Sequence, residues 1–268
     1  MSQTATRPSH IHVTPNESGF GAEITGLDLS QPLPPDVLAE VKQAWADHAV
    51  VWFPDQPLTH DQLEAFTLQI GPFGHDPFIA PMEDRPHILE LRRAPDEKAR
   101  NFGAGWHSDW SFQDAPPAAT LLHSKVVPPV GGDTLYADCA RAYDALSGTM
   151  KNLLDGLVAI HSAALPYGTK GVFAQETEAR TMKIIVSEEA ESPVYTAGIE
   201  GMTQAESAAI LGFLYNHMTR DEFVYRHKWR ANMLTMWDNR CTLHFADGGY
   251  DGHLRVMHRT TVAGDAPH

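Results

Sequence analysis

Short segments rich in β-branched and other apolar residues recur through the chain, and turns containing glycine and proline separate them. They are HILELRR (87–93), AATLLHSKVV (118–127), DTLYA (133–137), LVAIHSA (157–163), MKIIV (182–186), MLTMW (233–237) and LRVMHRTTV (254–262). They do not show the regular alternation of strand and helix that is typical of a parallel sheet. The pattern predicts a mainly β fold with flanking helices (α+β) and a double-stranded β-helix, or jelly-roll, core.

Few segments indicate helices. Residues 34–48, PPDVLAEVKQAWADH, carry apolar side chains at i, i+3 and i+7. Two capping-box patterns, Thr59 with Gln62 and Thr203 with Glu206, predict the starts of two further helices. No repeat, low-complexity segment or linker interrupts the sequence, so we expect one domain over residues 1–268.

Composition limits the possible partners. Lys and Arg number 20 against 34 Asp and Glu, a formal net charge of -14, which argues against binding to nucleic acid or to an anionic membrane. The N-terminus has no apolar segment of signal-peptide length, and no apolar stretch is long enough to span a bilayer. Only Cys139 and Cys241 are present, as expected in a reducing compartment, so we expect a cytoplasmic protein.

The stretch GWHSDWSF (105–112) places His107 and Asp109 one residue apart in a segment that reads as a strand. Side chains two positions apart on a strand point to the same face, so an imidazole and a carboxylate would converge. An H-x-D pair alone is weak evidence for a metal site, because such pairs are common on protein surfaces. A third ligand must come from elsewhere in the sequence.

That ligand is predicted in WDNRCTLHFADGGYDGHLRVMHRTTVAG (237–264), which reads as a β-hairpin with a glycine-rich turn. The hairpin would place His244 in one cavity with Arg255 and Arg259. Two buried arginines without anionic partners would be unfavourable, so such a cavity should bind anions. His107, Asp109 and His244 together match the 2-His-1-carboxylate triad of non-haem Fe(II) oxygenases.

The sequence resembles the Fe(II)/2-oxoglutarate-dependent dioxygenases grouped with taurine dioxygenase and 2,4-dichlorophenoxyacetate dioxygenase (TauD/TfdA). The resemblance runs from about Gly21 to Asp265, and its motifs occur in the family's order. These motifs are WHSDWSF (106–112), GGDTLYAD (131–138), WDNRCTLHFA (237–246) and RVMHRTTVAGD (255–265). The resemblance implies that His107, Asp109 and His244 are the catalytic iron ligands.

The resemblance also implies residues for the organic ligands. Arg255 resembles the partner of the distal carboxylate of 2-oxoglutarate, a task suited to a planar guanidinium, and Thr134 resembles the hydroxyl that supports it. Arg259 resembles an arginine that binds the acid group of the substrate. Asp76 and Gly103 match the positions where the taurine enzyme contacts taurine through a histidine and an asparagine. We therefore expect substrate contacts at both positions and a substrate other than taurine.

The activity implied by the resemblance uses O₂ and the cosubstrate 2-oxoglutarate. Oxidative decarboxylation to succinate and CO₂ is coupled to hydroxylation of a small anionic organic substrate. Hydroxylation next to an aryloxy, sulfate or sulfonate group leads to C–O or C–S cleavage. Asp109, where halogenating relatives have Gly or Ala, favours hydroxylation. Relatives are often homo-oligomers, and we expect the same here.

Two alternatives stay open. Relatives usually carry a further turn and strand between the positions of Val194 and Tyr195, which this chain lacks, so a catalytically impaired metal-binding relative is one alternative. A zinc hydrolase with the same three ligands is the other, although it would not need Arg255 and Thr134 arranged for a dicarboxylate.

Overall fold

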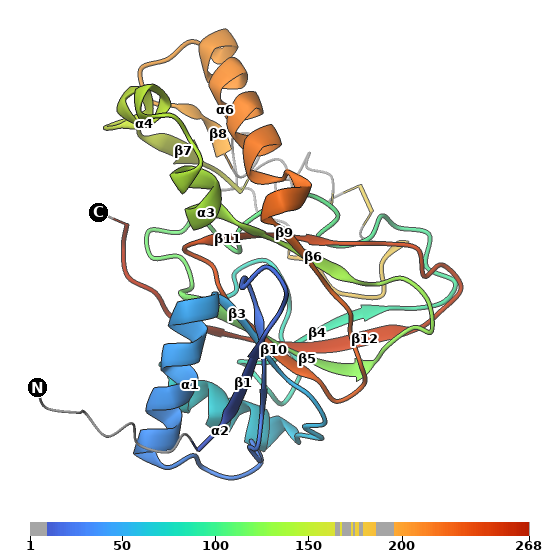
Figure 1. Cartoon of the computed structure of the whole chain (residues 1–268). Coiled ribbons are helices and arrows are strands. Elements are labelled where there is room, and N and C mark those ends of the chain that lie inside the picture. The colour runs from blue at the N-terminus through green and yellow to red at the C-terminus, as the bar shows by residue number, and fades with distance from the viewer. Residues whose placement is uncertain are drawn as a thin grey trace, which may run out of the picture.

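The computed structural model describes residues 10–163, 167, 173, 175–176, 179–185 and 196–267. Its framework is a seven-stranded sheet of order β1-β2-β3-β10-β5-β12-β4 and a three-stranded sheet of order β11-β6-β9. The large sheet contains β1 (His12–Pro15), β2 (Ala22–Thr25), β3 (Val50–Phe53), β4 (Leu89–Arg93), β5 (Ala119–Val126), β10 (Leu234–Asp238) and β12 (Arg255–Val262). The small sheet contains β6 (Thr134–Asp138), β9 (Val224–His227) and β11 (Thr242–Ala246), and it lies above the large sheet in Figure 1. The expected mainly β, jelly-roll class is confirmed.

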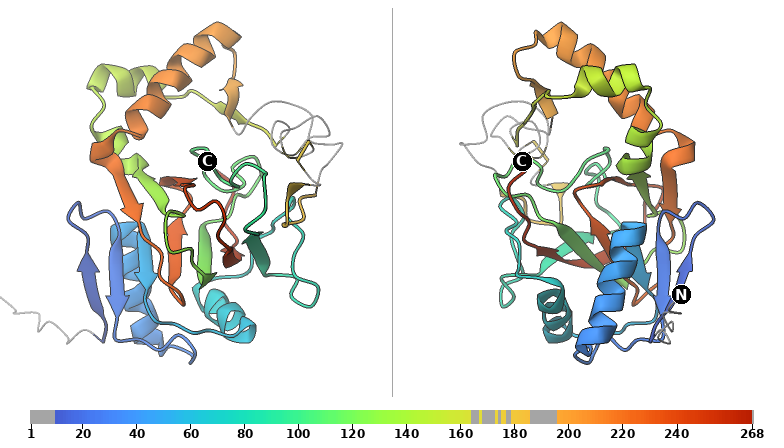
Figure 2. Two further views of the ribbon diagram at one scale, coloured as in Figure 1. Left: turned by 90° about the vertical axis from the view of Figure 1, so that its right-hand side faces the viewer. Right: turned by 60° about the vertical axis from the view of Figure 1, so that its left-hand side comes forward.

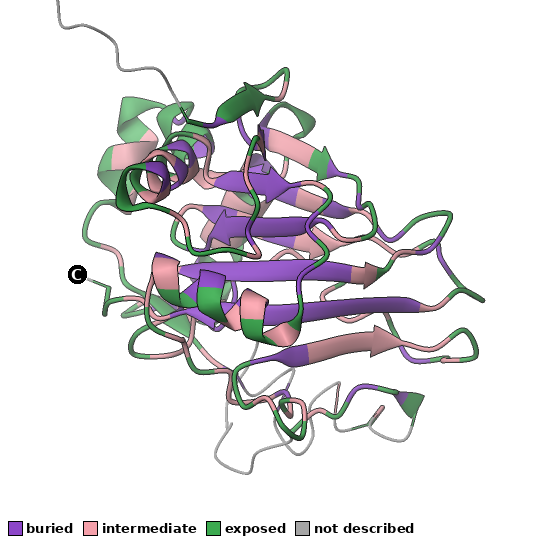
Figure 3. Ribbon diagram, turned by 90° about the horizontal axis from the view of Figure 1, so that it is seen from below, coloured by how far each residue is buried: buried purple, intermediate pink, exposed green. Residues whose placement is uncertain are grey.

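Two helices cover the outer face of the large sheet, α1 (Pro35–His48) and α2 (His60–Ile70). Helix α2 begins at the predicted capping box, in which the Gln62 backbone N–H donates to the Thr59 hydroxyl and the Thr59 N–H donates to the Gln62 side chain. Apolar residues of both helices, including Val41 and Phe66, pack against β3 and β10 in one buried cluster. Figure 3 shows the central strands of the large sheet buried along most of their length.

A second apolar layer lies between the two sheets. It contains Leu122 and Met257 from the large sheet and Tyr136 from the small one. Strand β12 is buried at every position, and its residues alternate between the two layers. Val262 joins the layer under the helices, whereas Met257, with Arg255 and Arg259 at the same parity, faces the small sheet. The arginines are therefore directed into the space between the sheets.

The remaining elements form a lobe at the top of Figure 1. They are α3 (Cys139–Asp144), α4 (Gly148–Leu154), β7 (Ala159–His161), β8 (Thr196–Ile199), α6 (Gln204–Met218) and the 3-10 helix η2 (Asp221–Phe223). Strands β7 and β8 pair with each other, and α6 begins at the predicted Thr203–Glu206 capping box. Figure 2 shows the same lobe from two further sides. Among the helices that the structure describes, none is long and apolar enough to cross a membrane.

Three local predictions are wrong. The segment 237–264 is not a hairpin, because β11 pairs with β6 in the small sheet while β12 pairs with β4 and β5 in the large one. The stretch 105–112 is not a strand: His107 forms an isolated bridge and turns follow it. Residues 182–185 form only an isolated bridge, between Ile184 and Ile79. The position between Val194 and Tyr195, where relatives usually carry a further turn and strand, lies outside the described residues.

Candidate active site

The three predicted metal ligands meet at one end of the layer between the sheets. His107 and His244 exchange backbone hydrogen bonds: the His107 N–H donates to the His244 carbonyl at 3.1 Å, and the His244 N–H donates to the His107 carbonyl at 2.8 Å. This bridge adds the loop of the H-x-D motif to the edge of β11. Two imidazoles that are distant in sequence thereby lie with ring centroids 4.1 Å apart.

The ligand atoms form a compact group. Asp109 Oδ1 lies 3.9 Å from His107 Nε2 and 3.7 Å from His244 Nε2, and all three atoms lie within 4.8 Å of one another. His107 Nδ1 lies 2.7 Å from the Gly105 carbonyl, which accepts its hydrogen bond when Nδ1 carries the proton. That arrangement leaves the Nε2 lone pair directed toward the group. Imidazole nitrogen and carboxylate oxygen in this ratio suit a divalent transition metal such as Fe(II), so the donor set fits the predicted ion.

Burial sets suitable protonation states for these ligands. Burial lowers the pKa of His244 to about 3 and also lowers the pKa of His107, so both rings are neutral at pH 7. Burial alone would raise the pKa of Asp109, but the electrostatic interaction with Arg259, followed by those with His244 and His107, outweighs burial and lowers the pKa to about 2. Two neutral imidazoles and one carboxylate are the forms that bind metal.

A chain of buried hydrogen bonds orients the carboxylate. The Thr120 hydroxyl donates to Asp109 Oδ2 at 2.7 Å, and Asn239 Nδ2 donates to Thr120 Oγ1 at 2.9 Å. Trp237 Nε1 in turn donates to Asn239 Oδ1 at 2.9 Å. Because Oδ2 is occupied by Thr120, Oδ1 is the oxygen directed at the two histidines. Outer contacts of this kind fix the geometry of metal ligands.

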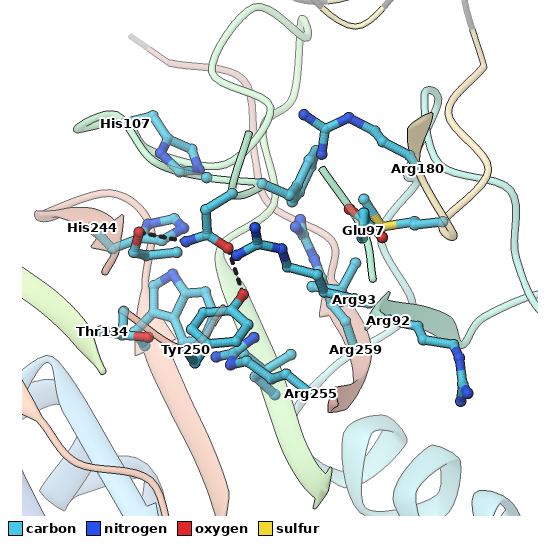
Figure 4. A pocket seen from close by; sticks show the side chains of 18 residues that line it. Arg92, Arg93, Glu97, His107, Thr134, Arg180, His244, Tyr250, Arg255 and Arg259 are labelled. Atoms are coloured by element: carbon cyan, nitrogen blue, oxygen red, sulfur yellow. Dashed lines mark hydrogen bonds between the residues drawn. The ribbon is translucent and has the colours of Figure 1, made fainter. Parts of the chain in front are cut away.

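Arg255 lies on the floor of the same cavity, near Thr134 (Figure 4). It is 9% exposed, and within the described residues its side chain donates one long hydrogen bond, 3.5 Å, to the Gly132 carbonyl. Among the described residues no carboxylate lies within 4.0 Å of it. Strand pairing also places it directly opposite Arg93, a second cation. A buried guanidinium in this setting favours the binding of an anion.

Thr134 is prepared to donate a hydrogen bond. Its hydroxyl already accepts one from Trp229 Nε1 at 3.0 Å, and both residues are buried. A hydroxyl that accepts from an indole still has its own proton to donate. Since Thr134 and Arg255 line one cavity, the hydroxyl and the guanidinium can bind the same carboxylate.

The three predicted substrate residues have different surroundings. Gly103 lines the cavity at a φ of 77°, and a Cβ there would lie 3.5 Å from His107 Cε1. Arg259 also lines the cavity and is 3% exposed, but two carboxylates contact it. Asp76 is absent from the cavity wall and lies beside Arg259 instead.

The cavity has a volume of about 740 Å³, part of it open to solvent. Its wall includes Phe102, a candidate for the pocket wall in the sequence, and residues that the sequence did not indicate: Leu91, Arg93, Glu97, Asn101, Arg180, Met182 and Tyr250. The Tyr250 hydroxyl donates to Asn101 Oδ1, and Asn101 Nδ2 donates to the Ala246 carbonyl at the end of β11. Arg93 lies over the Tyr250 ring. Leu91 and Arg93 lie on β4 and the others come from loops, so no single periodic pattern marks the set.

A jelly-roll core with two histidines and one carboxylate, beside a buried arginine that has no carboxylate partner among the described residues, is typical of non-haem metal oxygenases. Residues 9–261 match the family described as Taurine catabolism dioxygenase TauD, TfdA family. The chain therefore belongs to this family of dioxygenases and is an oxidoreductase, which confirms the predicted family and enzyme class.

Individual relatives agree with this assignment. The chain is 32% identical over 285 residues to the alpha-ketoglutarate-dependent sulfate ester dioxygenase of Pseudomonas putida, covering 98% of this chain and 93% of the relative. It is 32% identical over 276 residues to the alpha-ketoglutarate-dependent 2,4-dichlorophenoxyacetate dioxygenase of Cupriavidus pinatubonensis, covering 92% of this chain and 96% of the relative. A crystal structure of a taurine dioxygenase from Burkholderia xenovorans is similar with a TM-score of 0.78 and 32% identity, covering 96% of this chain and 92% of that one.

Proposed function

We propose that the protein couples oxidative decarboxylation of 2-oxoglutarate, to succinate and CO₂, to hydroxylation of a small anionic organic substrate. The observation that carries the proposal is Arg255, a buried guanidinium without an acidic partner among the described residues, in the same cavity as His107, Asp109 and His244. A zinc hydrolase would not need that arginine, and no relative reported above is a hydrolase. The group of His107, Asp109 and His244 argues against a catalytically impaired relative.

Each residue has a proposed task. His107, Asp109 and His244 hold Fe(II), which supplies the activation of O₂ and the oxidation of both organic molecules. Arg255 and Thr134 bind the distal carboxylate of 2-oxoglutarate through charge-assisted hydrogen bonds. The aromatic and aliphatic wall excludes water from the reacting atoms. Because Asp109 occupies the carboxylate position, the outcome is hydroxylation.

The substrate binds at the side of the cavity formed by Gly103 and Arg259, with Asp76 behind Arg259. Relatives named for sulfate esters and for an aryloxyacetate support an organic anion of one of these classes. Sulfonates form a third class to test, because the family name includes taurine catabolism. Hydroxylation of the carbon that bears the sulfate, sulfonate or aryloxy group would cleave the C–O or C–S bond and release that group.

We further propose that the chain acts as one domain, in the cytoplasm, as a homo-oligomer. Both cysteines are free, which suits a reducing compartment. Val158, Ile160 and Phe213 are exposed apolar residues of the upper lobe, and self-association would bury them. Sedimentation equilibrium measures the oligomeric state, and a monomer at micromolar concentration would refute that part.

The first test of function is an anaerobic titration of metal-free protein with Fe(II) and then 2-oxoglutarate. Chelation of the ion by the keto acid should give a visible charge-transfer band. We expect the band to be absent in His107→Ala and to need much more 2-oxoglutarate in Arg255→Ala. A folded wild-type protein without the band would refute the proposed function. Alkyl sulfates, sulfonates and aryloxyacetates would then be compared by succinate formation.

A further inference from the structure

Arg259 is enclosed by two carboxylates. Its Nη1 lies 3.1 Å from Asp109 Oδ1, and its Nη2 lies 3.2 Å from Asp76 Oδ1. The guanidinium also lies over the Trp110 ring, 5.2 Å from the centroid. Arg255, on the same face of β12, has no carboxylate within 4.0 Å in the part of the chain that is described. Two arginines that line one cavity therefore differ in how far their charge is balanced.

Asp76 is itself held firmly in place. Trp110 Nε1 donates to its Oδ1 at 2.5 Å, and the Thr261 hydroxyl donates to its Oδ2 at 2.8 Å. Its side chain is 9% exposed and does not line the cavity. The carboxylate thus has donors on both oxygens and lies behind the guanidinium, so it balances the charge of Arg259 without meeting the contents of the cavity.

We propose that Asp76 is a specificity-determining residue that weakens the binding of substrate anions at Arg259. The proposal rests on the function above, in which Arg259 faces the substrate. When a divalent cation takes up the charge of Asp109, Asp76 is the acid that still balances Arg259. A substrate anion must then share the guanidinium with Asp76, and it is repelled by that carboxylate through a low-dielectric wall.

The consequence is a defined substrate preference. The cavity that Arg259 lines is also lined by the apolar side chains of Leu91, Phe102 and Met182. A small anion that binds mainly through its charge loses most from the presence of Asp76. An anion with a large apolar part recovers affinity by burying that part against this wall. The site is therefore selective for organic anions with an extended aryl or alkyl group.

The test uses Asp76→Asn in the full chain loaded with Fe(II) and 2-oxoglutarate, without oxygen. Calorimetry would give the Kd of 2,4-dichlorophenoxyacetate, of hexyl sulfate and of the uncharged 2,4-dichlorophenoxyethanol. We expect both anions to bind about tenfold more tightly than to wild type, equivalent to about 1.4 kcal/mol. The Kd of the alcohol and that of 2-oxoglutarate should stay unchanged.

Two further variants separate charge from structure. Thr261→Val removes one donor to Asp76 but keeps the negative charge, so it should leave the anion Kd near the wild-type value. Asp76→Ser is a second neutral variant, used if the Asn variant does not show a cooperative unfolding transition. Anion binding that is unchanged or weaker in the neutral variants overturns the proposal. Loss of the 2-oxoglutarate band in wild type would instead refute the proposed function, so the two failures are distinguishable.

Discussion

Replacing Arg255 with methionine should stabilise the ligand-free protein and weaken its affinity for 2-oxoglutarate. Arg255 is buried, makes one long hydrogen bond to Gly132 and faces Arg93 directly across the strand pair. Like charges directly opposite each other on adjacent strands are destabilising. Arg93 has an ion pair with Asp251, but that carboxylate is 85% exposed, so the pair offsets little of the repulsion.

The expected magnitudes follow from this environment. Replacing buried charges by apolar residues of similar volume has stabilised proteins by about 1–4 kcal/mol. For a domain of this size each kcal/mol raises the Tm by about 2–4 °C. Removing one partner of a buried charge pair costs about 2–5 kcal/mol of binding free energy. The Kd of 2-oxoglutarate should therefore rise by about 30- to 4,000-fold.

Arg259→Met is the matched control, because the same substitution on the same strand should have the opposite effect. It leaves the carboxylates of Asp76 and Asp109 buried without their guanidinium, which costs about 3–5 kcal/mol. Added metal should restore part of this loss, since it supplies a new partner for Asp109 but not for Asp76.

The assay is thermal unfolding of both variants, metal-free and then with Zn(II) and the non-reacting analogue N-oxalylglycine. We expect a higher Tm for ligand-free Arg255→Met than for wild type, and no further rise when the analogue is added. A fall of several degrees in that variant, with the response to the analogue intact, would refute the account of Arg255 as a ligand-binding cation.

Three other predictions concern residues around the site and the core. Thr120→Val removes the donor to Asp109 Oδ2, so Fe(II) affinity measured by titration should fall about 10- to 100-fold, and an unchanged affinity would contradict the orienting role. Trp229→Phe removes the donor to Thr134 and should raise the KM for 2-oxoglutarate about tenfold with kcat nearly unchanged; a loss in kcat alone would argue against it. Burial lowers the pKa of His227 from the ordinary 6.5 to about 3, so the unfolded chain binds a proton that the folded one does not. Stability should therefore fall as the pH drops from 6.5 toward 3, by about 1.4 kcal/mol per pH unit inside that window, and urea midpoints of His227→Asn should vary less with pH.

The sequence predicted the group of His107, Asp109 and His244 that the structure brings together, but not how these residues meet. The alternation of side chains along a strand correctly placed Arg255 and Arg259 on one face, because that alternation is a property of a single strand. It could not show that β11 and β12 belong to different sheets. A close contact between loops accompanies that separation: a Cβ on Gly131 would lie 2.5 Å from the Gly248 carbonyl, and the φ of Gly131 is 64°. Glycine at position 131 permits both the approach and the backbone angle. The glycines at 248, 249 and 252 had predicted a hairpin turn instead.

The contacts of Asp76 with side chains distant in sequence were beyond prediction. Asp76 was matched to a substrate-contacting position by its place in a loop, yet its partners are Arg259, Trp110 and Thr261. Nothing in the local pattern distinguishes a carboxylate that faces a cavity from one that lies behind its wall. Strand β9, VYRH, was also missed, because it lacks the apolar run or alternation that marks a strand in sequence.

The difference between the two arginines explains how one cavity can treat two anions differently. Both lie on the inner face of β12, so the strand itself cannot distinguish them; the segment between α2 and β4 does so by supplying Asp76 to Arg259 alone. With a net charge of -14 the outer field does not attract anions, and affinity must come from short-range contacts inside the cavity. Under the proposed function, Arg255 retains its charge for the cosubstrate. A substrate anion meets a guanidinium already shared with Asp76, so its apolar part must supply the rest of its affinity.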